Sequence, residues 1–165
     1  MASLNPFPAE QSSRAGLARL IALVVPTGLL GGALGSQYLG GLAPCEMCYW
    51  QRWPHAAAIL LAGAAFLFSA SDRRSRALTL LAALAIAVSG AIGVFHAGVE
   101  IGWWEGLTRC AATGAVTLED IMKVPLVRCD QVQWAFLGIS MAGWNAILSL
   151  GAAAVIAYLV PKGRA

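Results

Sequence analysis

Four long apolar segments constrain the fold of this chain more than any motif does. They run from about Leu20 to Leu39, Ala56 to Ala70, Ala77 to Ala97 and Ala135 to Val160. A helix needs about 20 apolar residues to cross roughly 30 Å of hydrocarbon, where an open strand cannot satisfy its backbone. Because 59% of the residues are hydrophobic and only 12% are charged, an ordinary soluble domain is excluded. The sequence therefore predicts an all-α membrane protein, a four-transmembrane-helix bundle.

The predicted bundle accounts for the whole chain as a single domain, residues 1–165. We expect helices at about 20–39, 54–70, 77–97 and 135–160, with outward loops at about 40–53 and 98–134. The second helix reaches a normal length only if Trp53, Pro54 and His55 enter the membrane interface.

Glycines recur along the first apolar segment, and we interpret them as close-packing positions against neighbouring helices. They are Gly28, Gly31, Gly32 and Gly35. A cleaved signal peptide is the alternative interpretation of this segment, because small residues around Ala33 resemble a cleavage site. The apolar stretch continues past that site to Leu39, which favours an uncleaved anchor.

The distribution of basic residues predicts the orientation of the bundle. Seven of them share one side: Arg14, Arg19, Arg73, Arg74, Arg76, Lys162 and Arg164. Since positive charge is retained in the cytoplasm, both termini are expected there and all four cysteines face outward. In a bacterium the outward side is the periplasm, so we expect a multi-pass protein of the bacterial inner (cytoplasmic) membrane. The net charge of +3 is too small and scattered to indicate nucleic acid.

Two cysteines, Cys45 and Cys48, form a Cys-x-x-Cys motif directly after the first apolar segment. Cysteines at this spacing can close a short, reactive disulfide. A thiol near a helix start, with the cation of Arg52 four residues on, is biased toward the thiolate. Glu46 would oppose that bias if it faced the sulfurs, but we expect it to face solvent.

The other cysteines, Cys110 and Cys129, fall in the long outward loop. A bridge between them would be either a static staple or a mobile disulfide that reaches another site. Residues 117–124 have the pattern of a short amphipathic helix lying on the membrane. Trp103, Trp104 and Trp134 are expected as interface anchors, whereas Trp50 and Trp53 are either anchors or walls for a flat ligand.

These motifs together resemble the bacterial disulfide bond formation protein B (DsbB) family. The resemblance rests on four spans, an outward Pro-Cys-x-x-Cys with Arg52 after it, and a second loop ending in Arg128-Cys129-Asp130 and Trp134-x-Phe136-Leu137-Gly138. The family consists of quinone-dependent oxidases of the periplasmic thiol oxidant DsbA. It implies a quinone cofactor, either ubiquinone or menaquinone, and a DsbA-like thioredoxin-fold partner beside the membrane lipid.

The resemblance also implies roles for individual residues. The partner's thiolate attacks Cys110, the released Cys129 attacks Cys45, and Cys48 then passes electrons to the quinone, with Arg52 stabilising negative charge. His96 matches a family histidine near the quinone head group, although an interfacial histidine without that role is an equal alternative. His55 shares the face of Cys48 only if the helix continues through Pro54.

Three other interpretations remain open. In an enzyme like vitamin K epoxide reductase the Cys-x-x-Cys follows the loop cysteines, and here the order is reversed. A structural zinc site is disfavoured by the wide separation of Cys48 from Cys110 and by the oxidising compartment. The third interpretation is a non-catalytic transporter or assembly subunit with structural disulfides, but the predicted spans lack the buried charged pair expected of a transporter.

Overall fold

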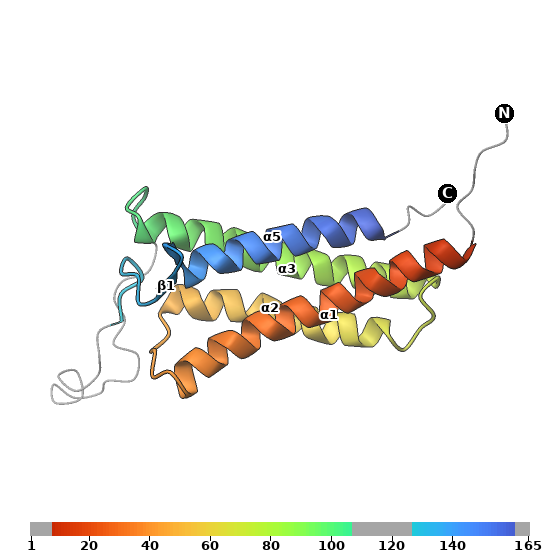
Figure 1. Ribbon diagram of the computed structural model, residues 1–165, viewed down its shortest axis with the longest axis horizontal. Helices are drawn as coiled ribbons and strands as arrows, with labels where there is room; N and C mark the ends of the chain where they lie inside the picture. The colour runs from red at the N-terminus through yellow and green to blue at the C-terminus, as the bar shows by residue number, and fades with distance from the viewer. Residues whose placement is uncertain (1–7, 107–126, 161–165) are drawn as a thin grey trace.

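The computed structural model describes residues 8–106 and 127–160, and four helices make up most of that part of the chain (Figure 1). They are α1 (Pro8–Tyr38), α2 (Glu46–Ala65), α3 (Arg73–Glu100) and α5 (Met141–Leu159). Helix α2 packs against α1 and α3, and α5 packs against α3 and α1, so the helices close a bundle. The start of α1, the end of α5 and the α2–α3 connection lie at one end of it (Figure 1).

Three of the described helices are long and apolar enough to cross a membrane: Glu10–Tyr38, Arg73–Glu100 and Met141–Leu159. Helix α2 is not among them. It has 20 residues, but Gln51, Arg52 and His55 interrupt its apolar surface close to its start. The predicted mostly helical membrane protein is therefore confirmed, whereas a fourth span at α2 stays a prediction.

Small side chains fill the centre of the bundle. Ala18 and Ala22 of α1, Ala58 and Ala62 of α2, and Ala82 of α3 are completely buried in one cluster. Such residues let helix backbones approach closely, which is the usual source of helix association in lipid. The helices are thus in close contact at these alanines, and Ile86 of α3 and Ile156 of α5 are the large, completely buried side chains of the same cluster.

Helix α2 begins at Glu46 and ends at Ala65, whereas the sequence predicted about 54–70. It begins earlier because the sulfur of Cys45 caps it, accepting a hydrogen bond of 3.2 Å from the backbone N–H of Cys48. Pro54 lies inside the helix and removes only its own N–H from the ladder. At the other end, Arg19 of α1 donates to the carbonyl oxygens of Ala65 and Phe68, at 3.2 and 2.9 Å. The Cys-x-x-Cys motif therefore begins a helix rather than lying in a loop.

The last helix begins at Met141, not at about residue 135 as predicted. Residues 135–140 instead form an antiparallel hairpin of β1 (Ala135–Phe136) and β2 (Ile139–Ser140). Its turn residues, Leu137 and Gly138, have φ of 54° and 78°, which a right-handed helix cannot contain. Ser140 then caps α5 by accepting a hydrogen bond of 3.1 Å from Gly143 N–H.

The remaining helices are longer than predicted. Helix α1 begins at Pro8 rather than near residue 20, and α3 extends from Arg73 to Glu100 because Asp72 caps it through a 2.7 Å hydrogen bond from Arg74 N–H. The predicted interfacial helix at 117–124 lies outside the described residues. So do Cys110, Lys162 and Arg164.

The interpretation of the α1 glycines as packing positions is wrong within this chain. A Cβ atom added to any of the four would meet no other atom within 4 Å. Gly28 and Gly32 instead line a cavity, described below. The close helix contacts lie elsewhere, at Gly90 and Gly93 of α3, where an added Cβ would touch α5.

Candidate functional site

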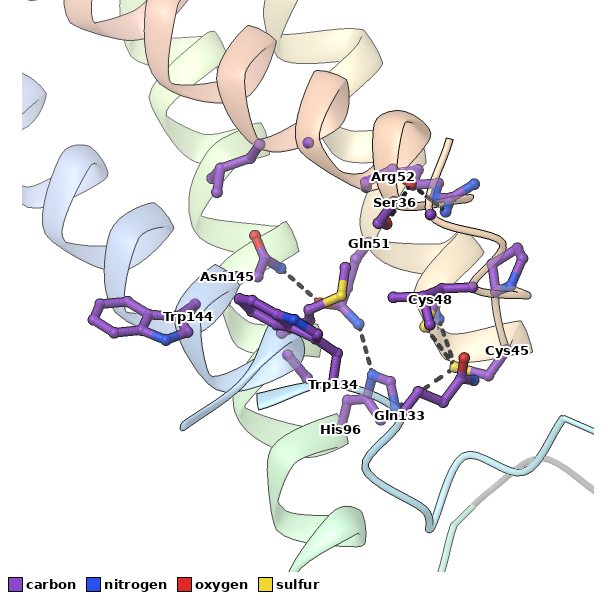
Figure 2. A pocket seen from close by; sticks show the side chains of 18 of the residues that line it. Ser36, Cys45, Cys48, Gln51, Arg52, His96, Gln133, Trp134, Trp144 and Asn145 are labelled. Atoms are coloured by element: carbon purple, nitrogen blue, oxygen red, sulfur yellow. Dashed lines mark hydrogen bonds between the residues drawn. The ribbon is translucent and has the colours of Figure 1, made fainter. Parts of the chain in front are cut away.

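The site is built on the first turn of α2. Cys45 is 3% exposed, and its sulfur lies 2.7 Å from the sulfur of Cys48 (Figure 2). The hydrogen bond with Cys48, followed by burial, raises the pKa of the Cys45 thiol. Cys45 therefore holds its proton more tightly than an isolated cysteine would. Glu46, between them, is exposed to solvent, as expected.

Cys129 lies against this pair. Its side chain packs, together with Phe95 of α3, on a buried cluster formed by Cys45, Met47 and Val99. The backbone of Cys129 also hydrogen-bonds the ring of His96. Three of the four predicted catalytic cysteines thus come together at one end of the bundle. The fourth, Cys110, lies outside the described residues.

Arg52 follows Cys48 by one helical turn and reaches toward α1. Its Nη1 donates to Gln37 Oε1 at 2.5 Å and its Nη2 donates to the carbonyl oxygen of Ala33 at 3.1 Å. The guanidinium also lies over the Tyr49 ring, 5.1 Å from its centre. Its Nε is buried and has no hydrogen-bond partner within the described part of the chain. One donor of this cation therefore remains available beside the cysteine pair.

His96 connects the sulfurs to a buried carboxylate. Its Nε2 lies 3.6 Å from the Cys45 sulfur and 3.8 Å from Glu100 Oε1, one turn further along α3. Ser140, the cap of α5, donates a short hydrogen bond to the other oxygen of Glu100. The predicted site histidine is thus in contact with Cys45, and the contact brings α3 and the hairpin into the site.

The other ring nitrogen of His96 meets a polar network in the bundle interior. Gln51 Nε2 lies 2.9 Å from His96 Nδ1, and Asn145 Nδ2 of α5 donates to Gln51 Oε1 at 2.7 Å (Figure 2). Both amides are buried. Buried polar groups need partners, and here each amide supplies them to a neighbouring helix.

His55 stands at the inner end of this network. Because α2 continues through Pro54, His55 falls on the buried face with Met47 and Gln51. Its Nε2 is 2.9 Å from both Asn145 Oδ1 and Ser89 Oγ. Its Nδ1 is buried without a partner among the described residues.

A cavity of about 820 Å³ adjoins these groups. Cys48, Arg52, His55 and His96 line it on one side, and it extends to Gly28 and Gly32 of α1. Its aromatic lining comes from Phe136, Trp134 and Trp144, and Figure 2 labels the two tryptophans. Trp50 and Trp53 do not line it, so the suggestion that they wall a flat ligand is not supported.

Cys45, Cys48 and His96 also meet a geometric requirement for metal binding, since their ligand atoms lie within 4.8 Å of one another. The surroundings of His96 argue against that use. A metal-bound histidine donates its second ring N–H to an acceptor, whereas here Nδ1 of His96 faces the N–H₂ group of Gln51. The hydrogen bond at Nδ1 therefore disfavours a metal ion on these three residues.

The fold and this site define a class: a helical membrane protein that carries a redox-active cysteine pair at the start of a bundle helix. The comparisons with known proteins identify the family. The model of the DsbB family, described as "Disulfide bond formation protein DsbB", matches residues 15–159. The chain belongs to this family and is a membrane protein of disulfide bond formation.

Curated relatives match the sequence of this chain over most of their length. Disulfide bond formation protein B of Aromatoleum aromaticum is 31% identical over 146 residues, which cover 82% of this chain and 86% of the relative. The Hahella chejuensis protein of the same name is 31% identical, over 79% of this chain and 84% of its own. Disulfide bond formation protein B of Xanthomonas euvesicatoria is 29% identical, over 98% of this chain and 96% of its own. No solved structure gives a significant match.

Sequence reasoning missed the polar residues that surround the predicted ones. Ser89 and Asn145 lie within apolar segments, and polar side chains inside a membrane span mark functional or packing sites. That rule would have identified both. Glu100 gave no comparable signal because it ends its helix, and only the fold shows that it faces His96.

Proposed function

We propose that this protein reoxidises a DsbA-type dithiol oxidase of the periplasm and passes the electrons through two cysteine pairs to a membrane quinone. The observation that carries the proposal is the packing of Cys129 on the buried cluster that contains Cys45, on which Cys48 also packs. A thiolate must line up with the sulfur that it attacks, and this contact brings a loop cysteine to the pair.

The exchange steps follow from this contact. The partner's thiolate attacks Cys110 of a Cys110–Cys129 disulfide, and the electron pair of that bond leaves on Cys129. The Cys129 thiolate then attacks Cys45, the Cys45–Cys48 bond breaks, and its electron pair leaves on Cys48. Cys48 lies four residues before Arg52, and the charge of Arg52 acts on its sulfur. Cys48 is therefore the sulfur from which electrons leave the protein.

The cavity fits a quinone in size and in donor groups. Its volume of about 820 Å³ lies within the usual range for small-ligand sites. The unpaired Nε–H of Arg52 is a donor suited to a carbonyl oxygen, and the unpaired Nδ1 of His55 is an acceptor suited to a hydroxyl group. Gly28 and Gly32 leave room that a side chain would fill. When bound, a quinone would accept two electrons and two protons and so supply the oxidising power.

Charge supports the orientation that the proposal needs. Arg14 and Arg19 in the first half of α1 and the arginines at the start of α3 belong to the end of the bundle where α1 begins, and the Cys-x-x-Cys motif at the start of α2 belongs to the other end. With the basic end in the cytoplasm of a bacterial inner membrane, the cysteines face the periplasm.

The test is oxidation of a reduced DsbA-type protein by the purified chain in detergent, followed as quinone-dependent loss of thiols. We expect turnover by the natural chain and none by Cys48→Ser. A passive subunit with structural disulfides would give no turnover with either protein, and that result would refute the proposal.

A second variant tests the order of the steps. Cys129→Ala leaves Cys110 as a thiol, so this variant is offered a partner that lacks its resolving cysteine and carries its other cysteine as a mixed disulfide with thionitrobenzoate. Cys110 should displace the thionitrobenzoate and keep the partner bound, because no Cys129 thiolate is present to release it. Adding Cys110→Ala to this variant is the matched control and should trap nothing. Trapping through Cys45 instead would show that the partner bypasses the loop cysteines.

A further inference from the structure

Two backbone carbonyl groups determine how the buried amides are oriented. The side-chain nitrogen of Gln51 lies 3.1 Å from the carbonyl oxygen of Met47, which can only accept a hydrogen bond. The group that faces Met47 must therefore be the N–H₂ of Gln51. Rotating the amide by 180° would set two oxygens against each other in a buried site.

The same argument orients Asn145. Its nitrogen lies 3.2 Å from the carbonyl oxygen of Ser89 and 2.7 Å from Gln51 Oε1, which are both acceptors. Its oxygen accepts from Ser149 Oγ at 2.9 Å. Asn145 therefore holds the oxygen of Gln51 toward α5, which leaves the nitrogen of Gln51 facing His96.

The orientation of Gln51 decides which nitrogen of His96 carries the hydrogen. Because Gln51 donates to Nδ1 at 2.9 Å, Nδ1 is the unprotonated nitrogen of the ring. In the neutral ring the hydrogen then resides on Nε2. That nitrogen lies 3.6 Å from the Cys45 sulfur, within hydrogen-bond range for sulfur, and the sulfur shares it with Glu100 Oε1 at 3.8 Å and with the backbone of Cys129.

We propose that Gln51 is a positioning residue, supported by Asn145, that holds His96 in its Nε2–H tautomer so that His96 donates a hydrogen bond to the Cys45 sulfur. A donor at this point stabilises the thiolate of Cys45 relative to the thiol. The tautomer is independent of the proposed function. Its use in disulfide exchange rests on that function, because Cys45 leaves as a thiolate when its disulfide with Cys129 is broken and the electron pair of that bond stays on Cys45.

The first test is the ¹⁵N NMR spectrum of the His96 ring in the full chain in detergent, without quinone or partner. We expect an unprotonated Nδ1 in the natural protein. In Gln51→Glu a carboxylate can only accept, so Nδ1 should gain a hydrogen. Gln133→Glu is the matched control: it adds the same charge at the same cavity, but the side chain that hydrogen-bonds Nδ1 is still Gln51, so Nδ1 should stay unprotonated. A protonated Nδ1 in the natural protein would overturn the proposal.

The second test measures the effect on the sulfur. In a Cys48→Ser background, the ¹³Cβ shift of Cys45 is followed against pH with and without His96→Phe. Loss of a hydrogen bond to a charged sulfur should raise the titration midpoint by about one pH unit. Cys129, the other titratable group that acts on this sulfur, is retained in both samples.

Ser149→Ala is the matched control for the second test. It removes a hydrogen bond at the far end of the network and should leave the midpoint unchanged. An unchanged midpoint in His96→Phe would refute the contact with sulfur. Neither test depends on turnover, so a failure here is distinct from a failure of the proposed oxidase activity.

Discussion

Gly93 of α3 lies against the backbone of α5, and this contact gives a quantitative test of the packing. A Cβ atom at this position would lie 3.0 Å from the carbonyl oxygen of Ala142, 3.1 Å from the N of Ala146 and 3.1 Å from Asn145 Nδ2. Two of these atoms belong to the α5 backbone and cannot rotate away. In Gly93→Ala the two helices must therefore separate by a few tenths of an ångström.

The expected magnitude comes from comparison with Gly63→Ala in α2. There the added methyl group meets nothing within 4 Å, so the variant shows only the higher helix propensity of alanine, about 1 kcal/mol. Gly93→Ala has the same propensity gain but adds overpacking, which typically costs about 1–3 kcal/mol. We therefore expect Gly93→Ala to be about 1–3 kcal/mol less stable than Gly63→Ala.

The free energy of unfolding can be measured by titrating each variant with SDS in mixed micelles and following tryptophan fluorescence. The two variants carry the same substitution and differ only in what the methyl group meets. Equal stabilities would show that α3 and α5 are not in close contact at Gly93, and the positions assigned to Ser89 and Asn145 would fail with it.

Three further predictions concern single side chains. Arg52→Ala should raise the KM for quinone about tenfold and leave the KM for the dithiol partner unchanged, because the contacts of Arg52 lie toward α1 and the cavity. Steady-state kinetics with each substrate varied in turn would test this, and equal effects on the two KM values would contradict it. Arg19→Met should lower the free energy of unfolding by about 2 kcal/mol in the same SDS titration, because it removes the donor to the Phe68 carbonyl and one donor to the Ala65 carbonyl, which keeps Ser75 Oγ at 3.1 Å. Leu137→Asn should raise it by about 1 kcal/mol, because asparagine tolerates a φ of 54° better than leucine; a lower stability would contradict that assignment of backbone strain.

The helices could be predicted from the sequence because lipid leaves an apolar segment few alternatives to a helix. Their ends could not be predicted as well, because they depend on individual caps. The start of α2 depends on a cysteine sulfur, which is not among the preferred capping groups, and its end depends on Arg19 from another helix. The hairpin before α5 depends on a leucine with positive φ, which propensity disfavours.

The residues of the candidate site could likewise be predicted from the sequence, whereas their contacts could not. Cys45, Cys48 and Arg52 could be proposed from a local motif, and alternation of the spans then brings His96 to the same end of the bundle. The contacts of His96 could not be deduced, because they depend on the rotation of α3 and α5 about their axes. That rotation brings Asn145 to Gln51, and no spacing along the chain records it.

The sulfur of Cys45 is both a reactive group and the cap of α2, and this double use couples chemistry to the helix. An anionic sulfur is a stronger partner for the N–H groups of a first turn than a neutral one. Such coupling is reciprocal: ionisation of the Cys45 sulfur stabilises the first turn of α2 by the same free energy by which the formed turn stabilises the anionic sulfur. Solvent-exposed Glu46, at the first helical position, therefore becomes a place where the reduction potential of the pair can be adjusted without contact with either sulfur.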